Sequence, residues 1–468
     1  MSIDDRRDEF AEFSAMLARG EAQATSRGSR PTLEVEPDGR IAPPMDAAAV
    51  ARARRRRTRA GIATVVVVLM ILAVVGTYIP LALSAPVDAA TVHLQPVTAP
   101  KATAVALSLP QVGESAVSVA GAEDFEGTTG TNGILASSGG TAALPMASIS
   151  KLITALVILD AKPLGEKDAG PNITFSKADH DLYDKYYVMD ASIEPMSTGS
   201  VMSERDALAT ILVASACNYA EAMSTWAFGS QANFLSATRK WLSAHGMADT
   251  KLVEPTGVDA RNVSTPTDLI AIGKLAMANP LVATIVGSQS ASVANIGQIS
   301  NTNDLLGIDG VNGIKTGTLD SSDLLFSARV DVGIPEPITV VGVVLGGDSR
   351  QSVNDAARAL IASIQSGFQQ IRLVGEGDVF GTYTTPWNDD ATIVAGEHAS
   401  ALAWSNAAVT STRTTRKVTT AKTGTKVGSV TFVAGKATVT VPLVLKGSIT
   451  APDAWWRLTH PAHLFDPR

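Results

Sequence analysis

The strongest feature of the hydropathy pattern is an apolar run without a charged residue, Ile62–Leu83. At about 1.5 Å per helical residue this run is long enough to cross a hydrocarbon core of about 30 Å. An arginine cluster, Arg52–Arg59, comes directly before it, and such clusters stay on the cytoplasmic side of a membrane. The pattern therefore predicts a single transmembrane helix over residues 61–84, with the N-terminus inside the cell and the rest of the chain outside it.

A cleaved signal peptide is the main alternative for this segment. Leu83-Ser84-Ala85 resembles a cleavage site. However, the apolar run is longer than the 7–15 residues typical of signal peptides, and it begins about 60 residues into the chain. We therefore favour an uncleaved membrane anchor.

The segments on either side of this helix lack a regular hydrophobic period. Residues 1–60 are polar and are predicted to form a disordered cytoplasmic tail. Residues 85–110 repeat Ala, Pro, Thr and Val with few charges, and this composition indicates a linker. Ordered structure is expected to begin near Ser115.

From there the pattern predicts strands, then helices, then strands. Residues 116–120 and 133–136 have the features of short strands, and 338–345 those of a buried strand. Ser203 and Thr265 stand where N-caps of helices are expected, and residues 353–368 have apolar positions at helical spacing. This order favours an α+β domain over residues 111–373, in which helices cover an antiparallel sheet.

The pattern changes again at about residue 375. Apolar and polar residues alternate in runs such as 426–433 and 437–444, which indicates strands at short spacing. Residues 375–460 are therefore predicted to form a separate all-β sandwich.

Charge and composition narrow the range of functions. The net charge of −7 argues against a nucleic-acid-binding surface. A single cysteine, Cys217, excludes an intramolecular disulfide. The six histidines show no strong metal-ligand spacing, so we expect neither a metal nor a cofactor.

Ser148 and Lys151 form the only Ser-x-x-Lys in the chain and precede an apolar helix, residues 152–159. A serine hydroxyl is a nucleophile only when a base takes its proton. Lys151 lies one helical turn from Ser148 and can act as that base when burial beside a second cation favours the neutral amine. The following helix is almost uncharged, which indicates that Lys151 projects into the wall of a cleft. The pair predicts a serine acyl-transferase with a lysine base.

A second motif, Lys315-Thr316-Gly317-Thr318, lies on a predicted strand. Lys315 offers an ammonium group to an anionic substrate terminus, and Gly317 lets a substrate backbone approach the strand. The N–H groups of Thr318 and Ser148 could form an oxyanion hole. Lys422-Thr423-Gly424 repeats the pattern in the all-β part, has no Ser-x-x-Lys near it, and is interpreted as a chance turn.

With these motifs, the chain resembles the low-molecular-weight penicillin-binding proteins of the serine D-alanyl-D-alanine carboxypeptidase family, and more distantly the serine β-lactamases. The resemblance covers about residues 110–460 and rests on residues 147–156, 254–259, 301–303 and 310–317. It implies the helix-covered sheet of that family, an acyl-enzyme at Ser148, Lys151 as base, and Lys315 holding the terminal carboxylate of a D-Ala-D-Ala stem peptide. It also implies covalent inhibition by β-lactams.

The chain departs from the family at its Ser-x-Asn motif. Ser215 matches the family serine, which relays a proton to the leaving amine, but Cys217 occupies the asparagine position and Asn218 follows it. A thiol forms only weak hydrogen bonds, so the contact that an amide would make to Lys151 and substrate is in doubt. We interpret Cys217 as a small buried hydrophobe.

These observations favour a membrane-anchored D-Ala-D-Ala carboxypeptidase that acts on peptidoglycan stem peptides. A β-lactamase is one alternative, although no Glu-x-x-x-Asn loop is found for deacylation. A catalytically weak peptidoglycan-binding scaffold is another, because of Cys217.

Overall fold

The computed structural model describes residues 47–98, 100–125, 127–405 and 407–465. They divide into two units, of which the first ends at Ser84 and the second begins at Ala85. Most of the disordered tail predicted for residues 1–60 lies outside the described residues.

Within the part that the structure describes, the first unit contains one long helix, α2 (Ala47–Ser84). Its stretch Ala51–Ser84 is long and apolar enough to cross a membrane, with a mean hydropathy of 2.7 in an 18-residue window. The helix begins before the arginine cluster, so the expectation of disorder is wrong for residues 47–60. Arginine and alanine have high helix propensity, and extending an existing helix needs no new nucleus.

In the second unit, a five-stranded antiparallel sheet has the order β10-β11-β12-β2-β3. Its strands are β2 (Glu114–Ala120), β3 (Ala136–Ser138), β10 (Val311–Thr318), β11 (Ser322–Val330) and β12 (Ile338–Gly347). The strand predicted over 133–136 begins only at Ala136, while the strand predicted over 338–345 is confirmed.

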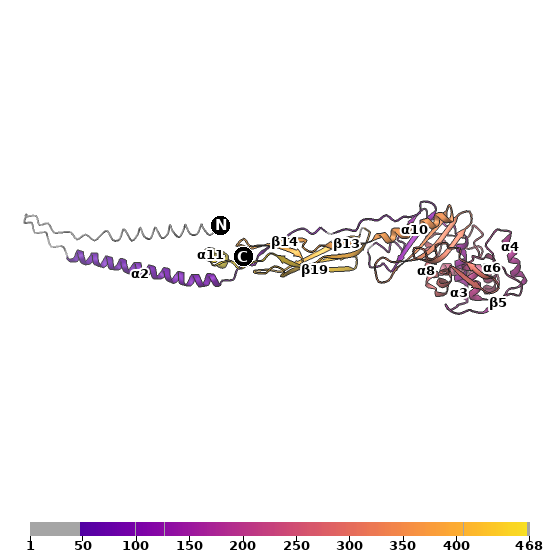
Figure 1. Cartoon of the computed structure of the whole chain (residues 1–468), viewed down its shortest axis with the longest axis horizontal. Helices are drawn as coiled ribbons and strands as arrows, with labels where there is room; N and C mark the ends of the chain where they lie inside the picture. The colour runs from indigo at the N-terminus through magenta and orange to yellow at the C-terminus, as the bar shows by residue number, and fades with distance from the viewer. Residues whose placement is uncertain (1–46, 99, 126, 406, 466–468) are drawn as a thin grey trace, which may run out of the picture. The chain divides into compact units, whose positions relative to one another are not determined.

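Helices cover both faces of this sheet (Figure 1). Alternate residues of β12 enter two different cores: Val341 and Val343 pack with α3 and α8, whereas Val340 and Val344 pack with α10. The predicted α+β fold class is thereby confirmed. The helices are η1 (Ala147–Ile149, a 3-10 turn), α3 (Ser150–Ala161), α4 (Lys177–Tyr187), α5 (Glu204–Leu212), α6 (Cys217–Phe228), α7 (Gln231–Ala244), α8 (Pro266–Ala278), α9 (Pro280–Val286) and α10 (Arg350–Gly367).

Capping residues begin several of these helices where the sequence predicts. Ser203 accepts a hydrogen bond from Asp206 N at 3.1 Å, and Thr265 accepts one from Asp268 N at 3.3 Å. Each cap satisfies a backbone N–H that the helix leaves free. Three two-stranded pairs connect the helices: β4 (Leu144–Pro145) with β7 (Val263–Ser264), β5 (Asn172–Thr174) with β6 (Val201–Ser203), and β8 (Ser290–Val293) with β9 (Gly297–Ser300).

A strand-rich region follows α10 and begins at Phe368, slightly earlier than the sequence indicates. It holds a six-stranded sheet of order β1-β14-β15-β19-β18-β17 and a β13-β16 pair. The strands are β13 (Phe368–Val374), β14 (Val379–Thr384), β15 (Asp390–Ala395), β16 (Ala399–Trp404), β17 (Val409–Thr415), β18 (Lys426–Ala434) and β19 (Ala437–Lys446). The short helices α11 (Ala454–Thr459) and α12 (Pro461–Phe465) end the described chain.

The segment 85–110 is not a free linker. It contains β1 (Thr91–Leu94), which pairs antiparallel with β14, Thr91 opposite Thr384. Further along, Thr103 N donates to Gln369 Oε1 at 3.0 Å. Order therefore begins before Ser115, because this segment completes the edge of a sheet whose other strands lie almost 300 residues later.

Candidate active site

Ser148 lies in the turn η1, which runs directly into α3. Lys151, in the first turn of α3, donates a hydrogen bond from Nζ to Ser148 Oγ at 2.9 Å. Lys151 is fully buried (0% exposed), whereas Ser148 is half-buried. The structure therefore brings together the predicted nucleophile and its base, and leaves the nucleophile open to a substrate.

A loop over residues 254–262 packs against this turn. The Thr256 carbonyl accepts a hydrogen bond from Lys151 Nζ at 2.7 Å, and the Pro255 carbonyl accepts one from Thr154 Oγ1 at 2.7 Å. Gly257 has a φ of +87°, and the Ala147 carbonyl occupies the space that a Cβ on Gly257 would need. The sequence contains no signal, beyond the family resemblance, that this loop touches Lys151.

Ser215 and Cys217 lie at the start of α6. Ser215 adopts a φ of +61° and is 3% exposed, and its Oγ has no hydrogen-bond partner among the described residues. Cys217 is buried, as we interpreted it, and its backbone N–H donates to the Ser192 carbonyl at 2.8 Å.

Asn218 does not take the place of the missing asparagine in this structure. Its Nδ2 donates to the Glu194 carbonyl at 2.8 Å, and its Oδ1 accepts from Glu194 N at 3.2 Å. Both ends of the amide are thus engaged by one backbone residue.

The second motif lies on β10, against which η1 packs. Lys315 is 1% exposed, and its Nζ donates to the Thr316 carbonyl at 3.2 Å. A Cβ on Gly317 would lie 3.0 Å from the Met146 carbonyl and 2.9 Å from Asp323 Oδ2, so only glycine lets the strand approach the catalytic turn. Thr318, the next residue, is exposed.

Comparison with known proteins agrees with this geometry. Residues 126–349 match the model of a family described as D-alanyl-D-alanine carboxypeptidase. This part of the chain belongs to that family. The resemblance inferred from the Ser148, Ser215 and Lys315 motifs is thereby confirmed.

Two curated relatives of this family are D-alanyl-D-alanine endopeptidases. The one from Escherichia coli is 31% identical over 32% of this chain and 46% of its own length. The one from Pseudomonas aeruginosa is 35% identical over 27% of this chain and 37% of its own length. The chain therefore spans less than half the length of these relatives. Penicillin binding protein 5 from Haemophilus influenzae is a solved structure similar to this chain, with 18% identity, a TM-score of 0.49, and coverage of 76% of this chain and 100% of that one.

The electrostatics of this family site centre on Lys315. Burial first, and then the neighbouring Lys151 and Arg350, lower the pKa of Lys315 to about 7, against an opposing effect of Cys217. The surroundings of Lys315 therefore disfavour its charged form, and an anion beside the amine would stabilise that form.

Sequence reasoning assigned no role to two polar residues beside this strand. Thr302 shares a hydrogen bond of 2.6 Å with Thr316 between their hydroxyls. Arg350, the first residue of α10, has a half-exposed side chain whose charge acts on Lys315. Arg350 follows Ser349, the N-cap of α10, and α10 begins just after β12 ends. The start of this helix was therefore the sequence signal that could have located Arg350.

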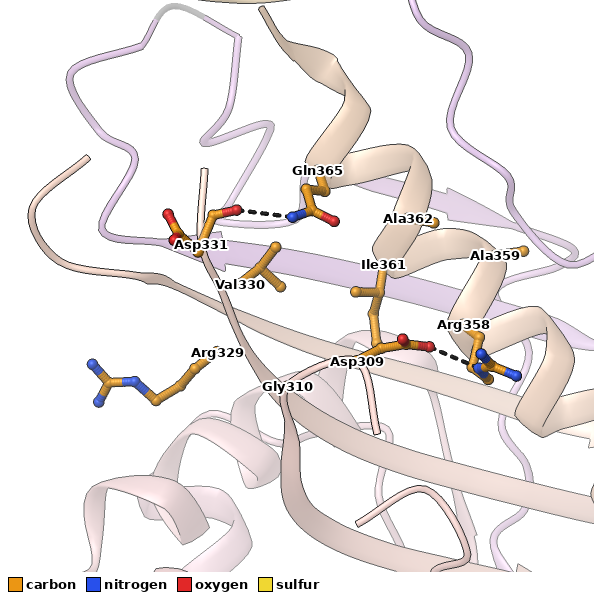
Figure 2. A pocket seen from close by; sticks show the side chains of 10 residues that line it. All are labelled: Asp309, Gly310, Arg329, Val330, Asp331, Arg358, Ala359, Ile361, Ala362 and Gln365. Atoms are coloured by element: carbon orange, nitrogen blue, oxygen red, sulfur yellow. Dashed lines mark hydrogen bonds and ion pairs between the residues drawn. The ribbon is translucent and has the colours of Figure 1, made fainter. Parts of the chain in front are cut away.

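A separate hollow of about 510 Å³ lies beside α10 (Figure 2). In it, Arg358 pairs with Asp309 at 2.7 Å, and Gln365 donates to the Asp331 carbonyl at 3.0 Å. Its lining includes none of the predicted catalytic or substrate-binding residues.

Proposed function

We propose that the protein is a membrane-anchored serine D-Ala-D-Ala carboxypeptidase, which removes the terminal D-Ala of peptidoglycan stem peptides through an acyl-enzyme at Ser148. The observation that carries this proposal is the 2.9 Å contact between Ser148 and the buried Lys151. It combines a nucleophile with a base that solvent does not reach.

Acylation begins when the neutral amine of Lys151 takes the hydroxyl proton of Ser148. The Ser148 oxygen then attacks the carbonyl of the penultimate D-Ala, and the oxyanion is held by the N–H groups of Ser148 and Thr318. Lys315 pairs with the terminal carboxylate, which orients the substrate along β10.

Collapse of this intermediate breaks the peptide bond. The departing D-Ala amine receives a proton through Ser215, whose hydroxyl is free for that role. Water then attacks the ester on Ser148, and Lys151 again accepts the proton. The products are D-alanine and the shortened peptide.

The names of the two curated relatives favour a second candidate, cleavage of D-Ala cross-links between stem peptides. The same groups would serve where the residue beyond the cross-link amide carries a carboxylate beside that amide. Purified cross-linked and uncross-linked muropeptides separate the two activities: the carboxypeptidase proposal predicts release of D-alanine, and the endopeptidase predicts conversion of dimers to monomers.

Intact mass of the full chain, solubilised from membranes and treated with penicillin, tests the proposal. We expect one covalent adduct, mapped to Ser148 and absent from Ser148→Ala, on a chain that keeps residues 1–84. A chain that begins near residue 85 would indicate a cleaved signal peptide instead of an anchor. A wild-type chain that labels no better than Ser148→Ala would refute the acyl-enzyme.

The rate at which the adduct disappears separates the remaining alternatives. Rapid loss with turnover of penicillin would indicate a β-lactamase. A wild-type protein that labels very slowly, and that Cys217→Asn accelerates strongly, would indicate a weakened site in a peptidoglycan-binding scaffold.

A further inference from the structure

The carboxylate of Glu254 folds back into the loop that contacts Lys151. Its Oε2 accepts hydrogen bonds from Thr256 N and Thr256 Oγ1, both at 2.7 Å. Its Oε1 accepts from Gly257 N at 2.6 Å and from Asn262 Nδ2 at 2.9 Å. Hydrogen bonds to a carboxylate are stronger than those between neutral groups. This side chain therefore fixes the two peptide units on either side of the Thr256 Cα, and the second of them contains the Thr256 carbonyl.

Asn262 fastens the same loop to α3. It is fully buried, and its Nδ2 donates to Ser150 Oγ at 3.1 Å as well as to Glu254. Thr154 donates to the Pro255 carbonyl from the next turn of the helix. Contacts from Ser150, Lys151 and Thr154 thus hold the loop along one side of α3.

The Thr256 carbonyl matters because Lys151 has few other partners. Among the described residues, Lys151 Nζ forms hydrogen bonds only with Ser148 Oγ and the Thr256 carbonyl. A neutral amine has two N–H donors and one lone pair. When the Thr256 carbonyl accepts one N–H, the amine is held with its remaining N–H and its lone pair on the side of the Ser148 hydroxyl.

We propose that Glu254 is a positioning residue for the reaction: it holds the Thr256 carbonyl on Lys151 and so orients the base toward Ser148. This inference rests on the proposed function. Glu254 has no hydrogen bond to Ser148 or Lys151 and acts through the backbone of its loop.

The test compares Glu254→Gln with the matched control Asp259→Asn in the full detergent-solubilised chain. Asp259 is a carboxylate of the same loop that pairs with Arg261 near the surface, at 2.5 Å. Glutamine has the size of glutamate, but its NH2 group would face either the Thr256 donors or the Gly257 and Asn262 donors. Both variants are titrated with fluorescent penicillin, which gives the fraction of active sites, the non-covalent affinity and the rate of the acylation step.

We expect Glu254→Gln to lower the acylation rate roughly 10- to 100-fold, the loss typical of a small misplacement of a reacting group. The labelled fraction and the non-covalent affinity should stay at the wild-type values, and Asp259→Asn should acylate at the wild-type rate. A reduced labelled fraction with a normal rate in the remainder would show a merely structural role and overturn the proposal.

A normal rate in Glu254→Gln would overturn it as well. If that variant does not fold, Thr256→Val decides. It removes the Oγ1 donor to Glu254, together with the Oγ1 acceptor of Val258 N, and keeps the backbone donors Thr256 N and Gly257 N. We expect a rate loss of roughly 2- to 5-fold, and an unchanged rate contradicts the proposal. Failure of the wild-type chain to label would instead refute the proposed function.

Discussion

Lys315 is a cation that the fold almost completely removes from water. Because burial and neighbouring cations set its pKa at about 7, its charge changes near neutral pH. Sequence reasoning placed the residue on a strand and predicts an anion-binding role for it, but the value of its pKa depends on tertiary burial that no local pattern contains.

Affinity for a carboxylate ligand should therefore depend on pH. Below pH 7 Lys315 is an ammonium group in the free enzyme, and above pH 7 it must first be protonated to bind an anion. We expect the affinity for an N-acylated D-Ala-D-Ala peptide to fall as pH rises from 6 to 9, about tenfold for each unit above 7. Inhibition constants measured against a chromogenic substrate check this, and the C-terminal amide of the same peptide, which lacks the anion, should not show the fall.

Asp323 is a second buried charge near the site, opposite Gly317 on β11. Burial raises its pKa to about 6, against a hydrogen bond from Gly346 N that lowers it. The native state therefore holds the proton more tightly than the unfolded chain does. The contribution of Asp323 to stability is highest below pH 4, falls as pH rises from about 4 to 6, and then stays low.

Asp323→Asn should remove this loss of stability at high pH, because asparagine stays neutral and its Oδ1 can still accept a hydrogen bond from Gly346 N. We expect an increase in the free energy of unfolding of about 3 kcal/mol at pH 7.5 and of less than about 1 kcal/mol at pH 4. Thermal unfolding midpoints at the two pH values measure it. An equal effect at both pH values would show that the charge of Asp323 is not the cause.

At the scale of elements, the site is built where a turn, a loop and a strand meet. The sequence allowed α3 to be predicted, because an apolar run follows Ser148, and β12, because its apolar run is continuous. It did not allow the approach of the 254–262 loop to be predicted, since that contact consists of backbone carbonyls, which every residue has. Gly257 was the one residue whose type could indicate this close contact.

Gly257→Ala tests how closely this loop must approach. A positive φ and the nearby Ala147 carbonyl both exclude a methyl group, so the loop must move away from the turn. We expect a stability loss of about 1–3 kcal/mol and an acylation rate at least roughly tenfold lower. Gly199→Ala is the control, because Gly199 also has a positive φ (+81°) but no atom lies within 4 Å of the point that a Cβ would occupy. It should lose stability without losing acylation rate.

At the scale of the whole molecule, the sequence predicted the elements that have a regular hydrophobic period, but it did not predict pairing between strands that are far apart in the chain. The helical stretch of α2 and the strands β18 and β19 follow from local patterns. The strand β1 could not be recognised, because its four residues are all exposed and its partner β14 is remote in sequence. A short edge strand has too few apolar positions to show a period, and only the complete sheet gives it a partner.

Because β1 pairs with a strand that is made much later, the parts of the second unit can be completed only in a certain order during synthesis. At about 5–20 residues per second, the ribosome needs roughly 15–60 s to progress from Thr91 to its partner Thr384. The region that carries Ser148 is made entirely within this interval. It can therefore fold while β1 has no partner strand. The C-terminal sheet can be completed only after its later strands have been made.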